Sequence, residues 1–354
     1  MTLTPFRLAA LASAALPDFA PSKVTMLPHS TDTLEALVSD DAGKQVTINV
    51  ALNALEALRG DAERSVLLIL TDKAAADLPF ALPEVLGQAS TSDVGSLRLS
   101  SSDDSADTHF DGEGQAFIFS ALPGSPLSLE QLRPGPGLTA SLGRALAAIH
   151  ELNPDIVRDA GLPDYDADSY RQRRLAEVDQ AAATGKVPAR LLNRWEKQLE
   201  NVALWRFQPT VCHGELSEDR VRAEGDRIVA VTGWAQLRVA DPADDLAWLI
   251  ASCDGTVIDS IMEAYSQARG EAPGPMLRRR AELLSELALV GWLLYGLSQN
   301  DQNVIDDATD MLAELDDQLH REEEAEREAS EAAASEADSP EDPEQNPGDG
   351  RQGY

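Results

Sequence analysis

The sequence has few cysteines and few aromatic residues. Its 354 residues include two cysteines and 5% aromatics, while 43% of the residues are apolar. Cys212 and Cys253 cannot form a disulfide framework, and the sequence has no CxxC or Cys/His spacing typical of a zinc site. We therefore expect reduced core thiols and a cytoplasmic protein, with a core built mainly from Leu, Ala, Val and Ile.

Apolar segments long enough to cross a membrane are also lacking, because a bilayer span requires about 20 apolar residues. The run LALVGWLLYGL at residues 287–297 is too short and predicts a buried helix. Another apolar run, at residues 8–16, follows a single arginine and precedes Pro17-Asp18. This arrangement favours an amphipathic first helix over a signal peptide.

Positive charge is scarce, with 29 Lys and Arg residues against 61 Asp and Glu residues and a net charge of -32. Residues 321–354 hold 12 acidic and 3 basic residues, and the rest of the chain is acidic as well. A field of this sign repels nucleic acids and anionic membranes. We expect neither as a partner, which leaves a small molecule or another protein.

The sequence divides into three parts. Residues 1–121 predict an N-terminal helix, several short strands and a helix near residues 61–77, which together form a small sheet-plus-helix lobe. Residues 122–320 follow a Pro/Gly-rich segment and predict a larger helical lobe. Residues 321–354 are acidic and rich in Ala, Ser and Pro, so we expect helix to about residue 335 and then disorder.

The expected fold class is therefore α+β, with a β-rich N-lobe and a helical C-lobe. Ser128 is the expected N-cap of the first C-lobe helix, with Gln131 three residues later. The expected strands are residues 23–26, 34–39, 45–50, 96–99 and 116–119, and the expected C-lobe helices are residues 128–132, 138–152, 167–182, 188–204 and most of 241–320.

One segment carries the chemical signal. Residues 213–234 read HGELSEDRVRAEGDRIVAVTGW, and DPADDLAW follows at residues 241–248. This pattern resembles the aminoglycoside and macrolide phosphotransferase family. Its members typically show His-Gly-Asp-Leu-His-x-Gly-Asn-Val, then Val-Ile-Asp-Trp, and then Asp-Pro-x-x-Asp-Leu-Ala. The spacing matches without a gap, and ALPG at 121–124 and LGRALAAIH at 142–150 are similar to the family's interlobe linker and following helix.

The resemblance covers roughly residues 5–320 and implies a bilobal protein-kinase-like fold. It places Glu215 at the position of the catalytic carboxylate and His213 in the supporting loop. The two metal-binding positions fall on Arg220 and Gly233. Mg²⁺ requires hard oxygen ligands, whereas Arg220 is permanently cationic and Gly233 has no side chain. The resemblance thus implies ATP or GTP as the nucleotide, but these residues predict that Mg²⁺ is not bound.

In the small lobe, the resemblance places the basic phosphate-binding residue at Ile48 or Asn49, neither of which is basic. Lys44 lies just upstream and could take that role if the register shifts. Glu63 matches the helix glutamate that orients the basic residue. Residues 29–37 contain no glycine, so a glycine-rich phosphate loop is missing. Arg220, Glu63 and Lys44 are therefore the candidate phosphate-site residues.

The remaining motif residues are expected to be structural. Asp241 and Asp245 are predicted to anchor the following helix, and Trp234 is predicted to lie in the core. We also predict that Arg220 pairs with Glu215 across a site without metal.

Three functions remain open. The first is a pseudo-phosphotransferase, or pseudokinase, that is inactive or metal-independent and binds a ligand or partner. The second is an active small-molecule kinase in which Glu215 is the base and Asp219 or Glu218 supplies metal ligands. Its base would have a longer side chain than Asp, and a displacement of about 1 Å can cost roughly 100-fold in rate. The third is an interaction protein whose acidic tail binds a basic partner.

Overall fold

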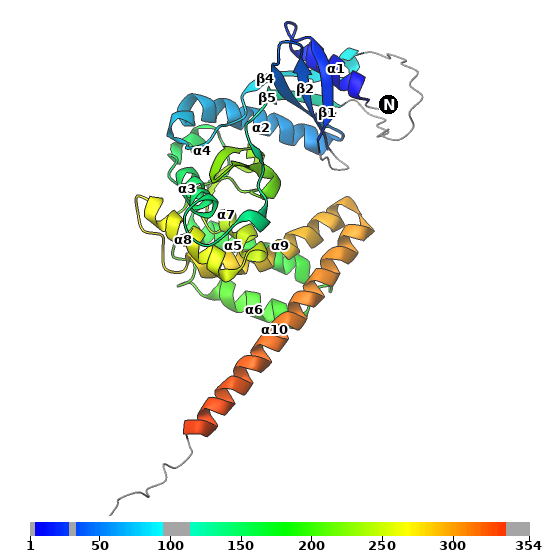
Figure 1. The fold of residues 1–354 in the computed structure, drawn as a ribbon. Coiled ribbons are helices and arrows are strands. Elements are labelled where there is room, and N and C mark those ends of the chain that lie inside the picture. The colour runs from blue at the N-terminus through cyan, green and yellow to red at the C-terminus, as the bar shows by residue number, and fades with distance from the viewer. Residues whose placement is uncertain (1–3, 28–32, 95–113, 338–354) are drawn as a thin grey trace, which may run out of the picture. The chain divides into compact units, whose positions relative to one another are not determined.

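The computed structural model describes residues 4–27, 33–94 and 114–337. A region with an antiparallel sheet is followed by a region composed mainly of helices (Figure 1). The predicted α+β arrangement is confirmed. The strand expected at residues 96–99 and the disorder expected after the last helix lie outside the described residues.

The N-terminal region contains a five-stranded antiparallel sheet with the order β1-β2-β3-β5-β4 (Figure 1). Strand β4 was not predicted, because Gly87 and Gln88 interrupt its apolar pattern and its pairing partner is distant in sequence. The strands are β1 (Pro21–Met26), β2 (Thr33–Asp40), β3 (Gln45–Ala51), β4 (Val85–Ser90) and β5 (Gln115–Ser120).

The two faces of β3 have different environments, because successive side chains of a strand point to opposite faces. Ile48 is buried in a core that also contains Leu8 and Leu11 of helix α1 (Pro5–Ala15). Asn49 lies on the other face, where its Nδ2 donates to Glu35 Oε1 at 3.1 Å. The resemblance placed the basic phosphate-binding residue at Ile48 or Asn49. Since Ile48 is part of the core, Asn49 is the better match for that position.

Helix α2 (Ala54–Lys73) begins earlier than the sequence predicted. Asn53 caps it, with Oδ1 accepting a hydrogen bond from the Glu56 amide at 2.9 Å. Gly60 allows the helix to approach the sheet, because a Cβ there would lie 2.2 Å from Cε2 of Phe117. The earlier start places two full turns of helix before Glu63, and these turns carry Arg59.

Two short sheets follow the linker. Strands β7 (Thr210–Cys212) and β10 (Arg238–Ala240) pair antiparallel. Strands β6 (Ser125–Pro126), β8 (Val221–Glu224) and β9 (Arg227–Val231) form a three-stranded sheet in the order β6-β8-β9. Arg222 of β8 also holds the linker, since its Nε donates to Pro123 O at 3.0 Å and its Nη2 to Gly124 O at 2.5 Å.

The helix predicted at residues 128–132 is wrong. That segment forms only a 3₁₀ turn (Leu129–Gln131), and the Ser128 side chain makes no cap hydrogen bond. Glu218 Oε1 accepts from the Leu129 amide at 2.8 Å instead. The other helices are α3 (Leu138–His150), α4 (Asp155–Asp159), α5 (Ala167–Ala182), α6 (Ala189–Glu200), α7 (Asp244–Ser252), α8 (Gly255–Ala268), α9 (Leu277–Gln299) and α10 (Gln302–Ala337).

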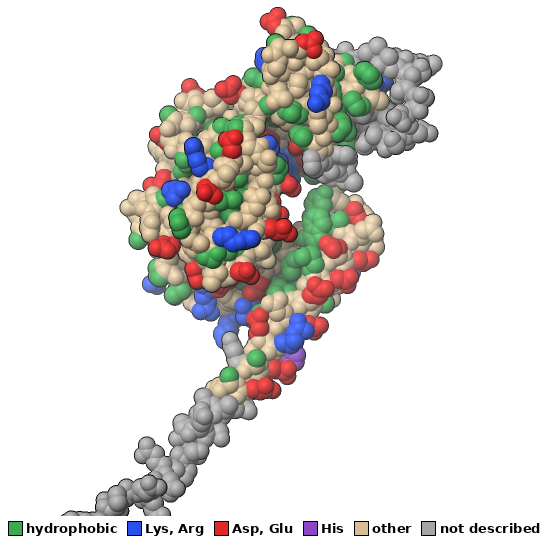
Figure 2. All heavy atoms as spheres, viewed as in Figure 1, with side chains coloured by type: hydrophobic (Ala, Val, Ile, Leu, Met, Phe, Trp, Pro, Cys, Tyr) green, Lys and Arg blue, Asp and Glu red, His purple; other side chains and the backbone are tan. Residues whose placement is uncertain are grey.

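The chain forms two compact units. The first comprises Met1–Ala176 and Gln198–Leu287, and it contains the sheet, α2 and the segment from His213 to Trp234. The second comprises Glu177–Lys197 and Ala288–Tyr354, including all of α10. Figure 2 shows acidic side chains along the visible face of that helix.

Helix α9 is long and apolar enough, by length and composition, to cross a membrane. Core helices also meet this test, and one such helix is weak support for a span. The prediction of a buried helix holds for one face, which contains Leu287, Val290 and Leu293. On the other face Trp292 and Tyr295 are each 38% exposed, and their rings stack.

Candidate functional site

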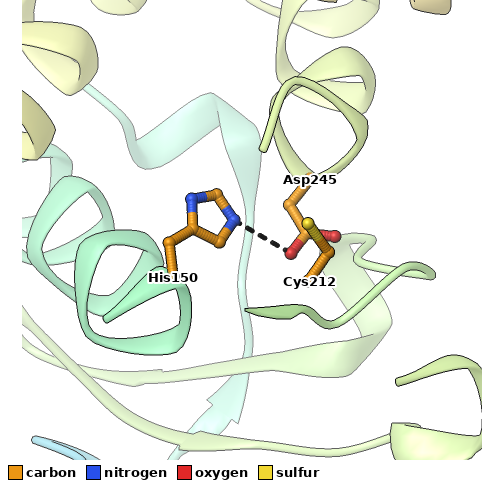
Figure 3. Close-up of side chains that lie close together, drawn as sticks. All are labelled: His150, Cys212 and Asp245. Carbon is orange, nitrogen blue, oxygen red and sulfur yellow. Dashed lines mark hydrogen bonds and ion pairs between the residues drawn. The ribbon is translucent and has the colours of Figure 1, made fainter. Parts of the chain in front are cut away.

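Asp245 anchors the loop that follows β7. Its Oδ2 accepts from the His213 amide and its Oδ1 from the Gly214 amide, both at 2.7 Å. His150 Nε2 lies 3.2 Å from Oδ2 (Figure 3). Burial alone would raise the pKa of Asp245, but the hydrogen bond and charge of His150, together with the other donors, hold it below its ordinary value. The carboxylate thus fixes the start of the loop.

His213 joins this loop to the segment before Gly233. Its Nδ1 accepts from the Glu215 amide at 3.3 Å, and its Nε2 lies 2.9 Å from Thr232 O. These contacts assign the neutral tautomer with the proton on Nε2, which donates to Thr232. Burial lowers the pKa of His213, in agreement with the neutral form. Its ring packs edge-on against Trp234, which is fully buried.

His150, Cys212 and Asp245 place three potential metal-ligand atoms within 4.8 Å of one another (Figure 3). A metal would need the Cys212 thiolate, yet burial raises the pKa of this thiol well above its ordinary value. Its Sγ lies 3.4 Å from Asp241 O, and His150 Nδ1 lies 2.8 Å from the Tyr265 hydroxyl. The group is therefore a hydrogen-bonded support for the loop.

Glu215, the candidate base, forms an ion pair with Arg59 of α2. The predicted pair between Arg220 and Glu215 is wrong: no hydrogen bond or ion pair joins them in the described part of the chain. The reason is the early start of α2, which brings Arg59 to the loop one turn before Glu63. Residues 59 and 215 are far apart in sequence, so no local pattern indicated this pair.

The end of the Arg220 side chain lies where a side chain on residue 233 would lie. Gly233 has φ +82°, and a Cβ there would lie 2.6 Å from Cδ and 2.7 Å from Nε of Arg220. The Thr232 amide also donates to Arg220 O at 2.8 Å, which fixes the two backbones side by side. The arginine stem thus fills the volume that a side chain at position 233 would require.

Glu63 binds the backbone of the same segment. Its Oε1 accepts from the Gly233 amide at 2.9 Å and from the Trp234 amide at 3.2 Å. The basic residue that a helix glutamate would orient is absent, because Asn49 carries no charge. The Glu63 carboxylate instead holds backbone amides, and the nearby positive charge is that of Arg220. Burial raises the pKa of Glu63 above its ordinary value, although Arg220 opposes the shift.

Lys44 is not among these side chains. It lies in the turn between β2 and β3, where its amide donates to Asp40 Oδ1 at 2.8 Å. Its ammonium lies 5.9 Å from the centre of the Phe19 ring. The register shift that would have brought it to the phosphate site does not occur, because β3 pairs regularly with β2 and β5.

We call six of these side chains the arginine–glutamate cluster, since each interacts with another member through charge or a direct ion pair. Burial raises the pKa of Glu35, against the opposing charge of Arg220. Three carboxylates thus face three guanidinium groups. The members are Glu35, Glu63, Glu215, Arg59, Arg220 and Arg222.

These residues do not fit a divalent cation. Of the two positions that the resemblance assigns to metal ligands, Gly233 offers no side-chain oxygen and Arg220 carries a cation. Glu218, a candidate replacement ligand, uses Oε1 to accept from the Leu129 amide. A magnesium ion would therefore meet a fixed positive charge where it needs oxygen ligands.

A buried ion pair behind the site was missed by the sequence reasoning. Arg280 Nε donates to Asp241 Oδ2 at 2.5 Å, and its Nη2 donates to Oδ1 at 3.1 Å. The third nitrogen, Nη1, donates to Leu204 O at 3.2 Å. Arg280 is 1% exposed and Asp241 is fully buried. Arg278 to Arg280 form a basic run that by composition alone indicates a solvated surface. The predicted anchor Asp241 therefore acts through a partner on α9.

The Glu63→Gln variant is expected to change the pH dependence of stability. Because the pKa of Glu63 is raised on folding, the folded state favours its protonated form. This contribution to stability is fully present below about pH 4.5 and is lost as the pH rises through the folded-state pKa. Glutamine keeps the accepting oxygen and does not titrate. In urea unfolding at a series of pH values, the variant should gain stability relative to wild type as the pH rises.

Glu63→Ala is the matched comparison. It also removes the titration but leaves the Gly233 and Trp234 amides without their acceptor, which should cost about 1–3 kcal/mol at every pH. Parallel pH profiles for wild type and Glu63→Gln would show that this carboxylate does not titrate differently in the folded protein.

The fold is similar to that of macrolide 2'-phosphotransferase MphH from Brachybacterium faecium, with a TM-score of 0.68, 22% identity, and coverage of 86% of this chain and 97% of that one. Aminoglycoside 2'-phosphotransferase-IIIa bound to GDP gives a TM-score of 0.66 at 16% identity, covering 88% of this chain and 98% of that one. The predicted bilobal kinase-like fold is confirmed.

Among curated proteins, the uncharacterized protein YcbJ of Bacillus subtilis (strain 168) is 21% identical over 176 residues, which is 47% of this chain. The match spans 58% of that relative's length. The model of the phosphotransferase enzyme family, APH, matches residues 37–284. This match covers most of the chain and includes the whole arginine–glutamate cluster except Glu35. The chain therefore belongs to the phosphotransferase enzyme family.

Proposed function

We propose that this member of the family is a pseudo-phosphotransferase, which binds a nucleotide and acts by binding a ligand or partner. The observation that carries the proposal is the packing of Arg220 on Gly233 at the two metal positions. Phosphoryl transfer depends almost entirely on positioning and on neutralising phosphate charge. A chain that holds an arginine where the metal belongs has lost the usual means of neutralisation.

Two further contacts support the proposal. The small-lobe cation is replaced by Asn49, whose amide is hydrogen-bonded to Glu35. The base candidate Glu215 is paired with Arg59, so the carboxylate that would meet a substrate hydroxyl is already engaged by a guanidinium of α2. The first contact leaves the small lobe without its phosphate-binding cation, and the second engages the residue that would serve as base.

Nucleotide binding itself is proposed from the fold and from the relatives. Solved relatives include a GDP complex of aminoglycoside 2'-phosphotransferase-IIIa and a ternary complex of streptomycin, ATP and APH(2'')-IIa. We propose ATP or GTP as the ligand here, without Mg²⁺, in a cytoplasmic protein that binds neither nucleic acid nor membrane. The acidic residues of α10 are left as a surface for a separate protein partner.

The alternative is an active macrolide- or aminoglycoside-type kinase with Glu215 as base. The retained carboxylate favours it, since Glu215 is partly exposed. The Leu129 amide engages one of the two candidate metal ligands, Glu218, which leaves the exposed Asp219 as the other candidate.

Thermal unfolding with ATP or GTP separates the two functions. We expect either nucleotide to raise the melting temperature in EDTA, and excess Mg²⁺ to give no further rise, because neither predicted metal position, Arg220 or Gly233, offers an oxygen ligand. We also expect no phosphorylated product with a panel of macrolides and aminoglycosides. Stabilisation that requires Mg²⁺, or a product that disappears in Glu215→Gln, would establish the active kinase instead.

A further inference from the structure

Arg220 differs from the arginines around it in having no direct partner. Arg59 pairs with Glu215, and Arg222 donates to two linker carbonyls. Within the described residues, the Arg220 guanidinium makes no hydrogen bond and no ion pair. A guanidinium carries five N–H donors, and this side chain is only partly buried. This side chain therefore has capacity for a ligand.

The Arg220 side chain packs closely against its neighbours in the chain. Its stem rests on the backbone of Gly233, and its own backbone oxygen accepts from the Thr232 amide at 2.8 Å. Glu35 and Glu63 act on it through charge without a direct ion pair. A preformed cation with open donors thus stands at a position that in the family's motif holds a metal ligand.

We propose that Arg220 is the resident cation of a metal-free phosphate site, donating directly to the phosphate oxygens of the bound nucleotide. The proposal rests on the nucleotide binding proposed above and names the group that makes it independent of metal. The planar guanidinium matches two oxygens of a phosphate at once, which suits it to this role better than a lysine.

A phosphate site built on Arg220 predicts how Mg²⁺ changes the affinity for ATP. Mg²⁺ held by the nucleotide occupies the same phosphate oxygens and adds positive charge beside Arg220. Metal-free ATP should therefore bind more tightly than its magnesium complex, opposite to a metal-dependent phosphotransferase. Glu35 competes for the same cation, so Glu35→Gln, which keeps an acceptor for Asn49, should tighten binding.

Isothermal titration of the full chain with ATP and with inorganic tripolyphosphate, in EDTA and in excess Mg²⁺, tests this. Both ligands should bind in EDTA, and Arg220→Ala should weaken each by roughly 10- to 100-fold, the range expected for hydrogen bonds to a charged group. Arg220→Lys should lose less. Arg227→Ala, which removes an exposed arginine from the same hairpin, is the matched control and should bind as wild type does.

The outcomes separate the two proposals. Equal ATP binding by wild type and Arg220→Ala in EDTA would overturn the role of Arg220 and leave nucleotide binding standing. ATP binding only with Mg²⁺, or no binding under any condition, would overturn both. Should Arg220→Ala fold poorly in thermal unfolding, Glu35→Gln remains decisive, since unchanged or weaker binding in that variant would contradict the proposal.

Discussion

Replacing Arg280 by alanine should lower the free energy of unfolding by about 3–5 kcal/mol, the cost of leaving a buried charge without its partner. Arg280 is 1% exposed, and it is held by the fully buried Asp241 and by Leu204 O. The substitution also leaves a cavity next to Phe207, whose ring centre lies 4.7 Å from the guanidinium carbon. Urea unfolding followed by circular dichroism measures the loss.

The neighbouring arginine provides the control. Arg279 is exposed, and its replacement by alanine should change the unfolding free energy by no more than about 0.5 kcal/mol. The double variant Asp241→Ala/Arg280→Ala should lose less than the sum of the single losses, because neither charge is left alone. A loss in Arg280→Ala no larger than that in Arg279→Ala would show that the ion pair does not stabilise the fold.

Replacing Gly233 by aspartate, which restores the family's metal-binding residue, should destabilise the protein by about 2–4 kcal/mol. Two costs add. The backbone has φ +82°, which disfavours a side chain by roughly 1–2 kcal/mol. The new Cβ would also lie 2.6 Å from Arg220 Cδ, so the arginine must leave its place. The measurement is again the unfolding free energy.

Gly225 separates these two costs. It has φ +57° with no atom within 4 Å of the position of a Cβ, so Gly225→Asp should show only the backbone cost of about 1–2 kcal/mol. Adding Arg220→Ala to Gly233→Asp should recover the difference between the two glycine variants. If Gly233→Asp costs no more than Gly225→Asp, the close packing of Arg220 on residue 233 is contradicted.

Much of the loop region could be predicted because its pattern is contiguous. The segment from His213 to Trp234 matches a known motif without a gap, so its departures from that motif, including Glu215, Arg220 and Gly233, were visible in the letters. Helix α3 has regular apolar spacing, and both α3 and α5 were placed within a few residues. Local signals of this kind need no knowledge of distant contacts.

What the sequence could not supply were partners from distant segments. Arg59 meets Glu215, and Arg280 meets Asp241, across long separations that no periodicity records. Strand β4 exists because β5 offers it a hydrogen-bonding edge, not because its own residues alternate. The helix expected at residues 128–132 ends after a single 3₁₀ turn because Pro134 follows, and the residue before a proline is disfavoured in the helical conformation.

The packing of Arg220 on Gly233 bears on how such a sequence can change by single substitutions. A side chain at position 233 would fill the space that the far end of the arginine occupies, so a substitution at either position changes the room left for the other. The arginine must move before residue 233 can regain an aspartate, and the new residue would also carry the backbone strain of φ +82°. The two positions are thus coupled, and the cost of a metal ligand at position 233 depends on which residue stands at position 220.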